Sequence, residues 1–326
     1  VHTFYKKEAT AQQPATSKEE GNLVAFSGPD FKATFDKQSG LLTSYLYKKH
    51  EYILNGQGPR PFFWRAPTDN DYGANLPVRL KAWKEASYQE PKAESFQVTP
   101  GSNATTIKVT YRFPQTDARW DITYKIYASG VIKVDNRFVA EGDQAPMIPR
   151  VGLRMQLPES FTDLTYYGRG PKENYRDRRT SQFIGEYAIP VKDMYEPYVR
   201  PQENNHRTDI YWCALTDKTQ RGLLLIADRT FELNASNYPL ESMDSGDTID
   251  NGAPRTEKTH HRHLTDPLPE KMVDLFIDYR MMGVGGDDSW GATAHEPYLI
   301  RPGKENAIEY GFSLVPFDKK EDYKSL

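Results

Sequence analysis

Apolar side chains recur at every second position in several segments, and this period constrains the fold more than any other feature of the chain. In residues 107–113 the odd positions are Ile, Val, Tyr and Phe, and the even positions are Lys, Thr and Arg. Residues 120–126 repeat the alternation, residues 128–130 form a turn signal, and residues 132–138 return to the same pattern. Successive side chains of a β-strand point to opposite faces, so each segment predicts a strand with one buried face. Short turns between them predict antiparallel hairpins.

Few segments have the period of a helix. Further strands are expected at residues 31–36, 41–47, 151–157, 222–227 and 273–281. One short helix is indicated where Asn75 can cap the segment and Leu76, Leu80 and Trp83 share a side. Many hairpin-linked strands with one short helix predict an all-β fold, a large antiparallel β-sandwich, and exclude a barrel of eight β/α units.

The chain divides into three parts by composition. Residues 6–21 are polar and poor in β-branched and aromatic residues, so residues 1–22 are expected to be a linker or the end of a preceding domain. Residues 23–317 form the expected β-sandwich domain, and residues 318–326 a polar tail. Residues 239–257 are rich in Ser, Asp, Gly, Asn and Pro, which predicts an exposed loop.

Charge and hydropathy exclude several classes of protein. The net charge of −3 comes from scattered residues of both signs, which argues against a nucleic-acid partner. No window approaches the roughly 20 apolar residues of a membrane span, and no charged-then-apolar leader opens the chain at Val1, so a soluble protein is expected and the compartment, cytoplasmic or periplasmic, stays open. The single cysteine, Cys213, excludes internal disulfides and lies in an apolar run, where a buried thiol is expected.

Two turn segments combine aromatic, glycine and short polar residues: residues 62–73 and residues 282–290. Glycine permits tight backbone turns, and Asp, Asn and Ser can bond neighbouring amides, so a rigid loop can hold Trp290 away from the scaffold. The other tryptophans lie in apolar or alternating patterns and are expected in the core: Trp64, Trp83, Trp120 and Trp212. Trp290 is therefore the candidate for contact with the apolar face of a sugar.

Five ordered stretches carry a family resemblance. They are residues 64–71 (WRAPTDND), 168–175 (GRGPKENY), 198–204 (YVRPQEN), 261–264 (HRHL) and 285–290 (GGDDSW). From about residue 23 to residue 317, the chain resembles the C-terminal, "small chain" domain of the large bacterial β-galactosidases of glycoside hydrolase family two. The resemblance implies a supersandwich similar to that of galactose mutarotase, set beside a barrel domain that performs the hydrolysis.

The resemblance also assigns roles. The catalytic glutamates and the Mg²⁺ and Na⁺ sites of the family lie on the barrel, so we expect no catalytic residue, no cofactor and no activity from this chain alone. The tryptophan that matches Trp290 reaches into the galactose pocket and forms part of its wall. The implied partners are a galactoside such as lactose, the barrel and other domains of the parent chain, and further copies in a dimer or tetramer.

Two acidic residues next to Trp290 invite assignment as a catalytic pair. Retaining glycosidases need two carboxyl groups about 5 Å apart on either side of the scissile bond. Asp287 and Asp288 are adjacent, and adjacent side chains on an extended backbone point to opposite faces. We therefore expect structural turn carboxylates that support the loop or contact the sugar.

A second polar group lies in the first turn segment. Arg65, Asp69, Asn70 and Asp71 can bind sugar hydroxyls or form a structural network that fixes the loop, and we favour the network. Two further polar groups are expected to build the scaffold or its contacts with neighbouring domains. They are Glu203, Asn204 and Arg207, where His206 departs from the family pattern, and Arg169, Glu173, Asn174 and Tyr175.

Histidines suggest two alternatives. His261 and His263 are two apart on an expected strand and share a face, but zinc needs three or four converging ligands, so we expect edge packing and no metal site. An aldose epimerase of the mutarotase type needs a histidine acid and a glutamate base, for which His206 or His263 with Glu203 or Glu296 can nominally serve. A stand-alone carbohydrate-binding module is the other alternative.

Overall fold

The computed structural model describes residues 14–140, 147–246, 263–288, 291–301, 303, 305 and 307–318. The strands are β1 (Thr16–Glu20), β2 (Leu23–Ser27), β3 (Phe31–Asp36), β4 (Leu42–Tyr47), β5 (His50–Glu51), β6 (Arg60–Phe62), β7 (Ala93–Thr99), β8 (Thr105–Phe113), β9 (Ala118–Ile126), β10 (Ile132–Ala140), β11 (Arg150–Pro158), β12 (Asp163–Gly170), β13 (Phe183–Pro190), β14 (Arg207–Thr216), β15 (Gly222–Ser236), β16 (Met272–Met281) and β17 (Ile308–Phe317). The helices are α2 (Asp69–Gly73), α3 (Leu76–Arg79) and α4 (Lys81–Tyr88), with short 3₁₀ helices η1 (Pro114–Thr116), η2 (Val191–Asp193), η3 (Leu240–Met243) and η4 (Glu296–Tyr298).

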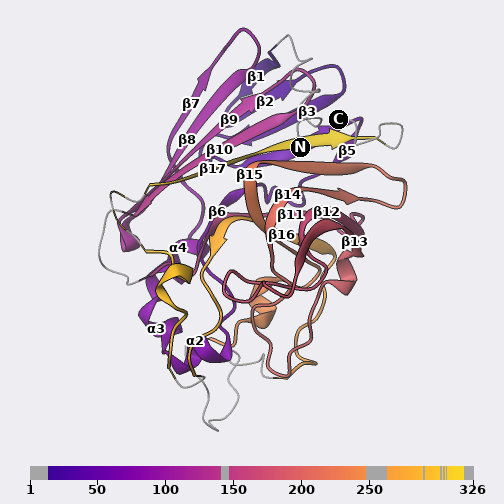
Figure 1. The fold of residues 1–326 in the computed structure, drawn as a ribbon. Helices are drawn as coiled ribbons and strands as arrows, with labels where there is room; N and C mark the ends of the chain where they lie inside the picture. The colour runs from indigo at the N-terminus through magenta and orange to yellow at the C-terminus, as the bar shows by residue number, and fades with distance from the viewer. Residues whose placement is uncertain are drawn as a thin grey trace.

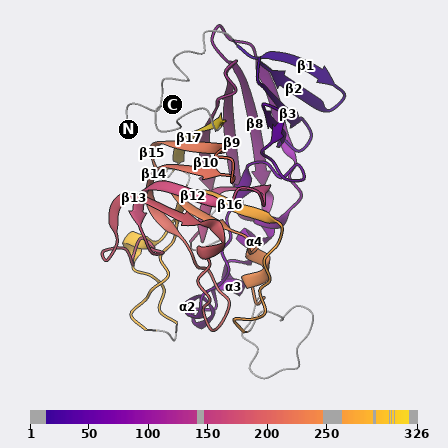
Figure 2. The ribbon, with the colours of Figure 1, turned by 90° about the vertical axis from the view of Figure 1, so that its right-hand side faces the viewer.

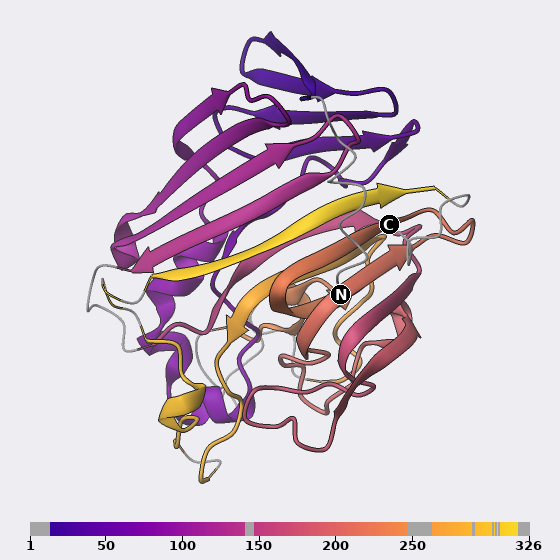
Figure 3. The same ribbon diagram turned by 45° about the horizontal axis from the view of Figure 1, so that its top comes forward.

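The described strands form two antiparallel sheets. The smaller sheet has the order β1-β2-β3-β4-β5, and the larger follows β13-β12-β14-β15-β17-β10-β9-β8-β7 (Figure 1). In Figure 3, β17, in yellow, lies between β10 on one side and β15 on the other. The expected all-β sandwich of antiparallel sheets is therefore confirmed.

Strand β15 joins two parts of the larger sheet. Its first half, residues 222–227, pairs with β17, and its last residues, 232–236, pair with β16. Residues 228–230 between these halves are exposed. Strands β16, β11 and β6 then continue from β15 as a side branch, so the large sheet curls rather than lying flat (Figure 2).

The core follows from the alternating pattern. In β9 every second residue from Ala118 to Ile126 is buried, as the sequence predicts. The smaller sheet packs against this face, since the ring of Phe35 in β3 lies 5.0 Å from that of Tyr124 in β9. Phe63 is surrounded by rings of the larger sheet and of α4, and fully burying such a side chain stabilises the fold by about 1.5–3 kcal/mol. Its neighbours are Trp83, Phe113, Trp120 and Phe138.

The residues expected in the core are buried. Trp64, Trp83, Trp120 and Trp212 have at most 5% of their surface exposed. Cys213 is fully buried, and burial raises the pKa of its thiol well above the ordinary value. An unreactive, protonated thiol follows.

The helical segment differs from the expected single helix capped by Asn75. Asn75 lies in the left-handed region at φ 54° and its side chain makes no capping bond; Pro77 stands in the first turn instead. Leu80, at φ −111°, separates α3 from α4. Leu76, Leu80 and Trp83 are buried as expected. The sequence predicted the apolar face of the helical segment correctly. It predicted the cap wrongly, because a proline in the first turn starts a helix without a side-chain cap.

Two segments expected to lack contacts are part of the fold. Residues 16–20, inside the expected linker, form β1 and pair with β2, although all five are exposed. Ladder hydrogen bonds come from the backbone, so a polar segment can still form an edge strand. The exposed-loop prediction is wrong for residues 239–246, since Leu240 and Met243 are buried and Asp244 accepts a bond from Trp64 Nε1 at 2.9 Å. Residues 247–257 lie outside the described residues.

The histidine prediction is corrected in part. His263 lies in a turn, where its amide bonds Asp266, rather than on a strand, and His261 lies outside the described residues. Among the described residues, no helix has both the length and the hydropathy that a membrane span requires.

Candidate functional site

The loop after β16 leaves the sheet at the end where α2 is placed, and its first residues are held by side chains from two distant segments. Arg65 lies beneath it and is 2% exposed. Its guanidinium donates to the carbonyls of Met282 and Gly283 at 2.7 and 3.0 Å. It also forms a two-point ion pair with Asp71, at 2.9 and 2.7 Å.

The residues at the start of α2 hold Asp71 in position for this ion pair. Thr68 caps α2 by accepting a bond from the Asp71 amide, and the Asp71 carboxylate in turn accepts a bond from the Thr68 amide. This capping box fixes Asp71 at the start of the helix, where it faces Arg65. Burial alone would lower the pKa of Arg65, but Asp71 raises it, so the guanidinium stays charged.

The next residues of the loop are bound by Asp177 and Asn70. The Asp177 carboxylate accepts the amides of Val284 and Gly285 at 3.2 and 2.7 Å, and Asn70 Nδ2 donates to the Val284 carbonyl at 3.3 Å. A Cβ on Gly283 would lie 2.5 Å from Asp177 Oδ2, so only glycine permits this close approach. Residues 282–285, bound by Arg65, Asn70 and Asp177, are called the braced loop below.

The other predicted site residues have different positions. Asp287 is exposed and its carboxylate lies 2.8 Å from His295 Nε2. Asp288 accepts a bond from the Ala292 amide at 3.2 Å, as a turn carboxylate does. Asp69 is exposed, 3.8 Å from Arg200. Trp290 lies outside the described residues.

A hollow of about 250 Å³ lies beside the braced loop, where Asn70 and Val284 form part of its wall. Its lining combines polar groups with two tyrosines, Tyr175 and Tyr198. Tyr198 donates a hydrogen bond to Glu173, which also accepts one from Arg178. This surface can bind a small polar molecule or a loop of another domain.

A buried ionic network supports the hollow from below. Arg150 is fully buried and lies 3.2 Å from Asp278 and 3.3 Å from Glu203. Burial raises the pKa of Asp278 to about 7. Glu232 is the reverse case: burial would raise its pKa, but bonds from His206 and the Met281 amide, together with the Arg176 charge, lower it. Both carboxyl groups are buried, but the pKa of Asp278 is raised and that of Glu232 is lowered, because only Glu232 receives enough hydrogen bonds.

The nominal acid and base of an epimerase do not meet as such a mechanism requires. His206 is fully buried, bonds Glu232 through Nε2 at 2.9 Å and stacks on Tyr175. Glu203 is also buried, against Arg150 and Asn234. Glu296 is exposed and paired with Arg301. Within the described ranges, no group of three or more His, Cys, Asp or Glu is arranged to hold a metal ion.

The remaining polar groups of the sequence have scaffold contacts. Asn174, fully buried, donates to the carbonyls of Arg169 and Lys172 and accepts from Thr208. Arg169 pairs with Asp209 at 2.7 Å. Two more residues bind main-chain groups: Arg207 donates to the carbonyls of Asn205 and His206, and the Asn204 side chain accepts a bond from the Glu196 amide.

Sequence reasoning missed Asp177 and Arg150. Asp177 stands two positions after the 168–175 stretch, and that short distance was the available signal. Arg150 directly precedes the strand expected at residues 151–157 and begins β11, where nothing local marks a buried charge.

Comparisons with known proteins agree with this architecture. A family model described as "Beta galactosidase small chain" matches residues 27–314. A β-galactosidase of Priestia megaterium is 33% identical over 291 residues, which cover 89% of this chain and 26% of that protein. A β-galactosidase of Lactobacillus delbrueckii subsp. bulgaricus is 32% identical over 308 residues, 91% of this chain and 28% of that protein. The chain thus spans about a quarter of the length of these relatives.

Solved structures are similar at low sequence identity. A TPR-domain containing protein from Parabacteroides distasonis has a TM-score of 0.50 at 12% identity, over 93% of this chain and 48% of that chain. A galactose 1-epimerase from Lactobacillus acidophilus has a TM-score of 0.48 at 6% identity, over 93% of this chain and 97% of that chain. The similarity to the Parabacteroides distasonis structure shows a shared fold and nothing more.

Proposed function

This chain belongs to the β-galactosidase small-chain family, and from that premise we propose that it is the non-catalytic C-terminal part of a β-galactosidase. In this proposal it completes the galactose pocket with Trp290 and stabilises the assembly. The reactive carboxyl groups, together with Mg²⁺ and Na⁺, belong to the part of the enzyme that this chain does not contain. The substrates are terminal β-galactosides such as lactose.

The observation that carries the proposal is the braced loop. Its backbone is fixed on both sides by charged side chains from residues more than 100 positions away, Arg65 and Asp177. An ordinary surface loop has no need of a buried guanidinium and a carboxylate that each bind two backbone groups. A loop that presents a side chain to a ligand does, because binding energy is lost when the contact is imprecise.

The carboxylates beside Trp290 support a non-catalytic role. Asp287 faces His295 and Asp288 binds a turn amide. Both carboxylates are engaged within the loop, whereas a retaining hydrolysis needs two carboxyl groups about 5 Å apart around the scissile bond. We therefore assign the chemistry to the part of the parent enzyme outside this chain.

The first experiment changes Trp290 in the assembled β-galactosidase. Trp290→Ala is expected to weaken substrate binding by about 1–3 kcal/mol, which is roughly 5-fold to 150-fold. Trp290→Phe, which keeps an aromatic face, should recover part of that loss. Trp212→Phe is the matched control, because Trp212 is buried in the sheet. Unchanged kinetics in Trp290→Ala would remove the proposed role.

The second experiment uses the chain by itself. It should not cleave nitrophenyl galactoside, and adding the remainder of the enzyme should restore cleavage. Polarimetry of α-galactose tests the epimerase alternative, and calorimetry with galactose tests the binding-module alternative. Hydrolysis by the isolated chain, free of contaminating enzyme, would overturn the assignment.

A further inference from the structure

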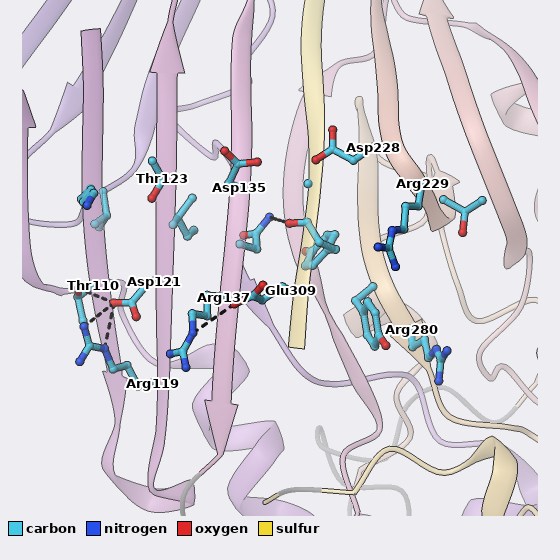
Figure 4. Close-up of a pocket in the computed structure, with 18 of the residues that line it drawn as sticks. Thr110, Arg119, Asp121, Thr123, Asp135, Arg137, Asp228, Arg229, Arg280 and Glu309 are labelled. Atoms are coloured by element: carbon cyan, nitrogen blue, oxygen red, sulfur yellow. Dashed lines mark hydrogen bonds and ion pairs between the residues drawn. The ribbon is translucent and has the colours of Figure 1, made fainter. Parts of the chain in front are cut away.

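The outer face of the large sheet carries a second, larger hollow of about 960 Å³, which shares no lining residue with the hollow beside the braced loop. Strands β7 to β10, β17, β15 and β16 contribute its walls (Figure 4). Its lining has six Lys or Arg residues and four Asp or Glu residues. The whole chain has a net charge of −3, so this hollow has the opposite sign.

The four acidic residues are engaged by neighbouring side chains. Asp121 accepts bonds from Arg119 and from Thr110, at 2.9 and 2.7 Å, and Glu309 pairs with Arg137 at 3.4 Å (Figure 4). The other two acids, Asp135 and Asp228, pair with Lys133 from either side. The lining residues of β8, β9, β10 and β17 include three basic and three acidic side chains, so this end of the hollow is close to neutral.

The opposite end has positive charge in excess. Figure 4 shows Arg229 of β15 and Arg280 of β16 on this side of the hollow. In the part of the chain that the structure describes, neither guanidinium forms an ion pair; that of Arg280 lies 5.1 Å from the ring of Tyr279. Asp228, the acid next to Arg229, is turned to Lys133 instead. Arg176 completes the group and is itself held by Glu232 at 3.1 Å.

Irregular backbone sets this arrangement. Pairing of β14 with β15 shifts register around Ile210, and pairing of β11 with β16 shifts between Val151 and Gly152, opposite Arg280. Residues 228–230 of β15 lie exposed where the strand passes from β17 to β16. Such irregularities redirect side chains and are frequent beside binding sites.

One tyrosine ring forms part of the floor. Tyr279 is partly exposed, and its ring lies 6.1 Å from that of Tyr310, which packs on the buried Trp120. The Tyr310 hydroxyl donates to the Ile277 carbonyl at 3.1 Å, which fixes the ring. Aromatic faces suit the C–H faces of sugars, and the arginine–carboxylate pairs of the walls suit their hydroxyls.

We propose that this hollow binds an acidic oligosaccharide, whose carboxylate or sulfate group lies between Arg229 and Arg280 and whose sugar rings extend over Tyr279. A neutral galactoside would leave both guanidinia unpaired. A nucleic acid is disfavoured, because the four acids of the lining would face its evenly spaced phosphates. This inference is independent of the function proposed for Trp290.

The test is calorimetry of the chain with three tetrasaccharides: tetragalacturonate, a sulfated galactotetraose and neutral galactotetraose. At least one acidic tetrasaccharide should bind about tenfold or more tightly than the neutral one, and its affinity should fall as salt is added. The acidic tetrasaccharide that binds more tightly shows whether the preferred anionic group is a carboxylate or a sulfate. Changing Arg229→Ala and Arg280→Ala together should lower the acidic affinity by about tenfold or more.

A control variant and a milder double variant accompany this test. Arg112→Ala is the control, because Arg112 lies on the same sheet, pairs with Glu94 at 3.2 Å and does not line the hollow. Arg229→Gln with Arg280→Gln replaces the alanine pair if that pair unfolds. The proposal is overturned if neither acidic tetrasaccharide binds, if the neutral one binds equally, or if the double variant keeps its affinity. Inorganic sulfate that binds as tightly as the tetrasaccharides overturns it as well.

Discussion

Arginines organise both the braced loop and the outer hollow, but they do so in opposite ways. Arg65 is buried and uses its donors on the Asp71 carboxylate and two carbonyls. Arg119, in the wall of the hollow, pairs with Asp121 with 41% of its side chain exposed. The same residue type thus fixes backbone in one place and covers a solvated surface in the other.

The difference is one of solvation. A buried charge that loses its partner remains uncompensated, so the whole arrangement depends on each member. An exposed pair is screened by water and salt and adds little to stability. The first kind of region holds a loop in one geometry, whereas the second can exchange its partners for a ligand.

The largest expected effect is at the buried arginine. Arg65→Met leaves Asp71 without its cation and two carbonyls without donors, so the free energy of unfolding should fall by about 3–5 kcal/mol. Urea denaturation followed by tryptophan fluorescence measures this. A loss below about 1 kcal/mol, the range of exposed pairs, would erase the contrast between the two regions.

The buried carboxyl group of Asp278 makes the free energy of unfolding depend on pH. Its folded-state pKa is about 7 because it is buried, whereas an unfolded aspartate titrates near ~3.9. The folded state therefore binds this proton more tightly, so the stabilisation is full below about pH 4 and is lost as the pH rises through about 7.

The check compares the wild type with Asp278→Asn by urea unfolding across that range. The stability of the wild type relative to the variant should decrease as the pH rises, by at most about 1.4 kcal/mol per pH unit. Titrating groups that do not interact with Asp278 are common to both proteins and cancel in the difference. A relative gain in wild-type stability over the same range would show that Arg150 outweighs burial.

Replacing Asp177 should lower the free energy of unfolding by less than Arg65→Met and by more than Arg119→Met. Asp177→Ala removes the acceptor of the Val284 and Gly285 amides, with an expected cost of about 1–3 kcal/mol. Hydrogen exchange at these two amides should become faster, while amides in the centre of β9 should keep their protection. Asp177→Asn retains one carbonyl acceptor and should fall between wild type and alanine. Unchanged exchange at both amides would show that Arg65 and Asn70 fix the loop without Asp177.

The smallest effect is expected at the outer hollow. Arg119→Met removes an exposed partner of Asp121 and should change the free energy of unfolding by about 0–1 kcal/mol. It is the matched control for Arg65→Met, because the substitution is the same and only burial differs. A loss as large as that of Arg65→Met would mean that the wall of the hollow is structural.

The strands were predictable because their signal is local. The strand expected at residues 31–36 is β3 with the same bounds, and the strand expected at residues 120–126 lies within β9. The same holds for residues 151–157 in β11. Predictions failed where the determining contact is distant or comes from the backbone. Polar residues 16–20 form a strand because β2 supplies hydrogen bonds, and residues 239–246 pack because Trp64 and Lys84 bind Asp244.

The candidate site shows the same division. Arg65 and Asn70 were named from the sequence, together with the preference for a structural network. Their target, the backbone of residues 282–284, lies more than 200 positions away. Asp177 was missed because a carboxylate that binds backbone amides has no pattern of its own in the sequence.

The sequence by itself determined the fold class, the buried tryptophans and the family, since alternation and ordered motifs are properties of neighbouring residues. Only the tertiary structure decided which charges are buried, which loop they fix and where positive charge gathers. These depend on how a curled sheet brings distant strands together, and the desolvation of a charge is defined only once its surroundings are folded.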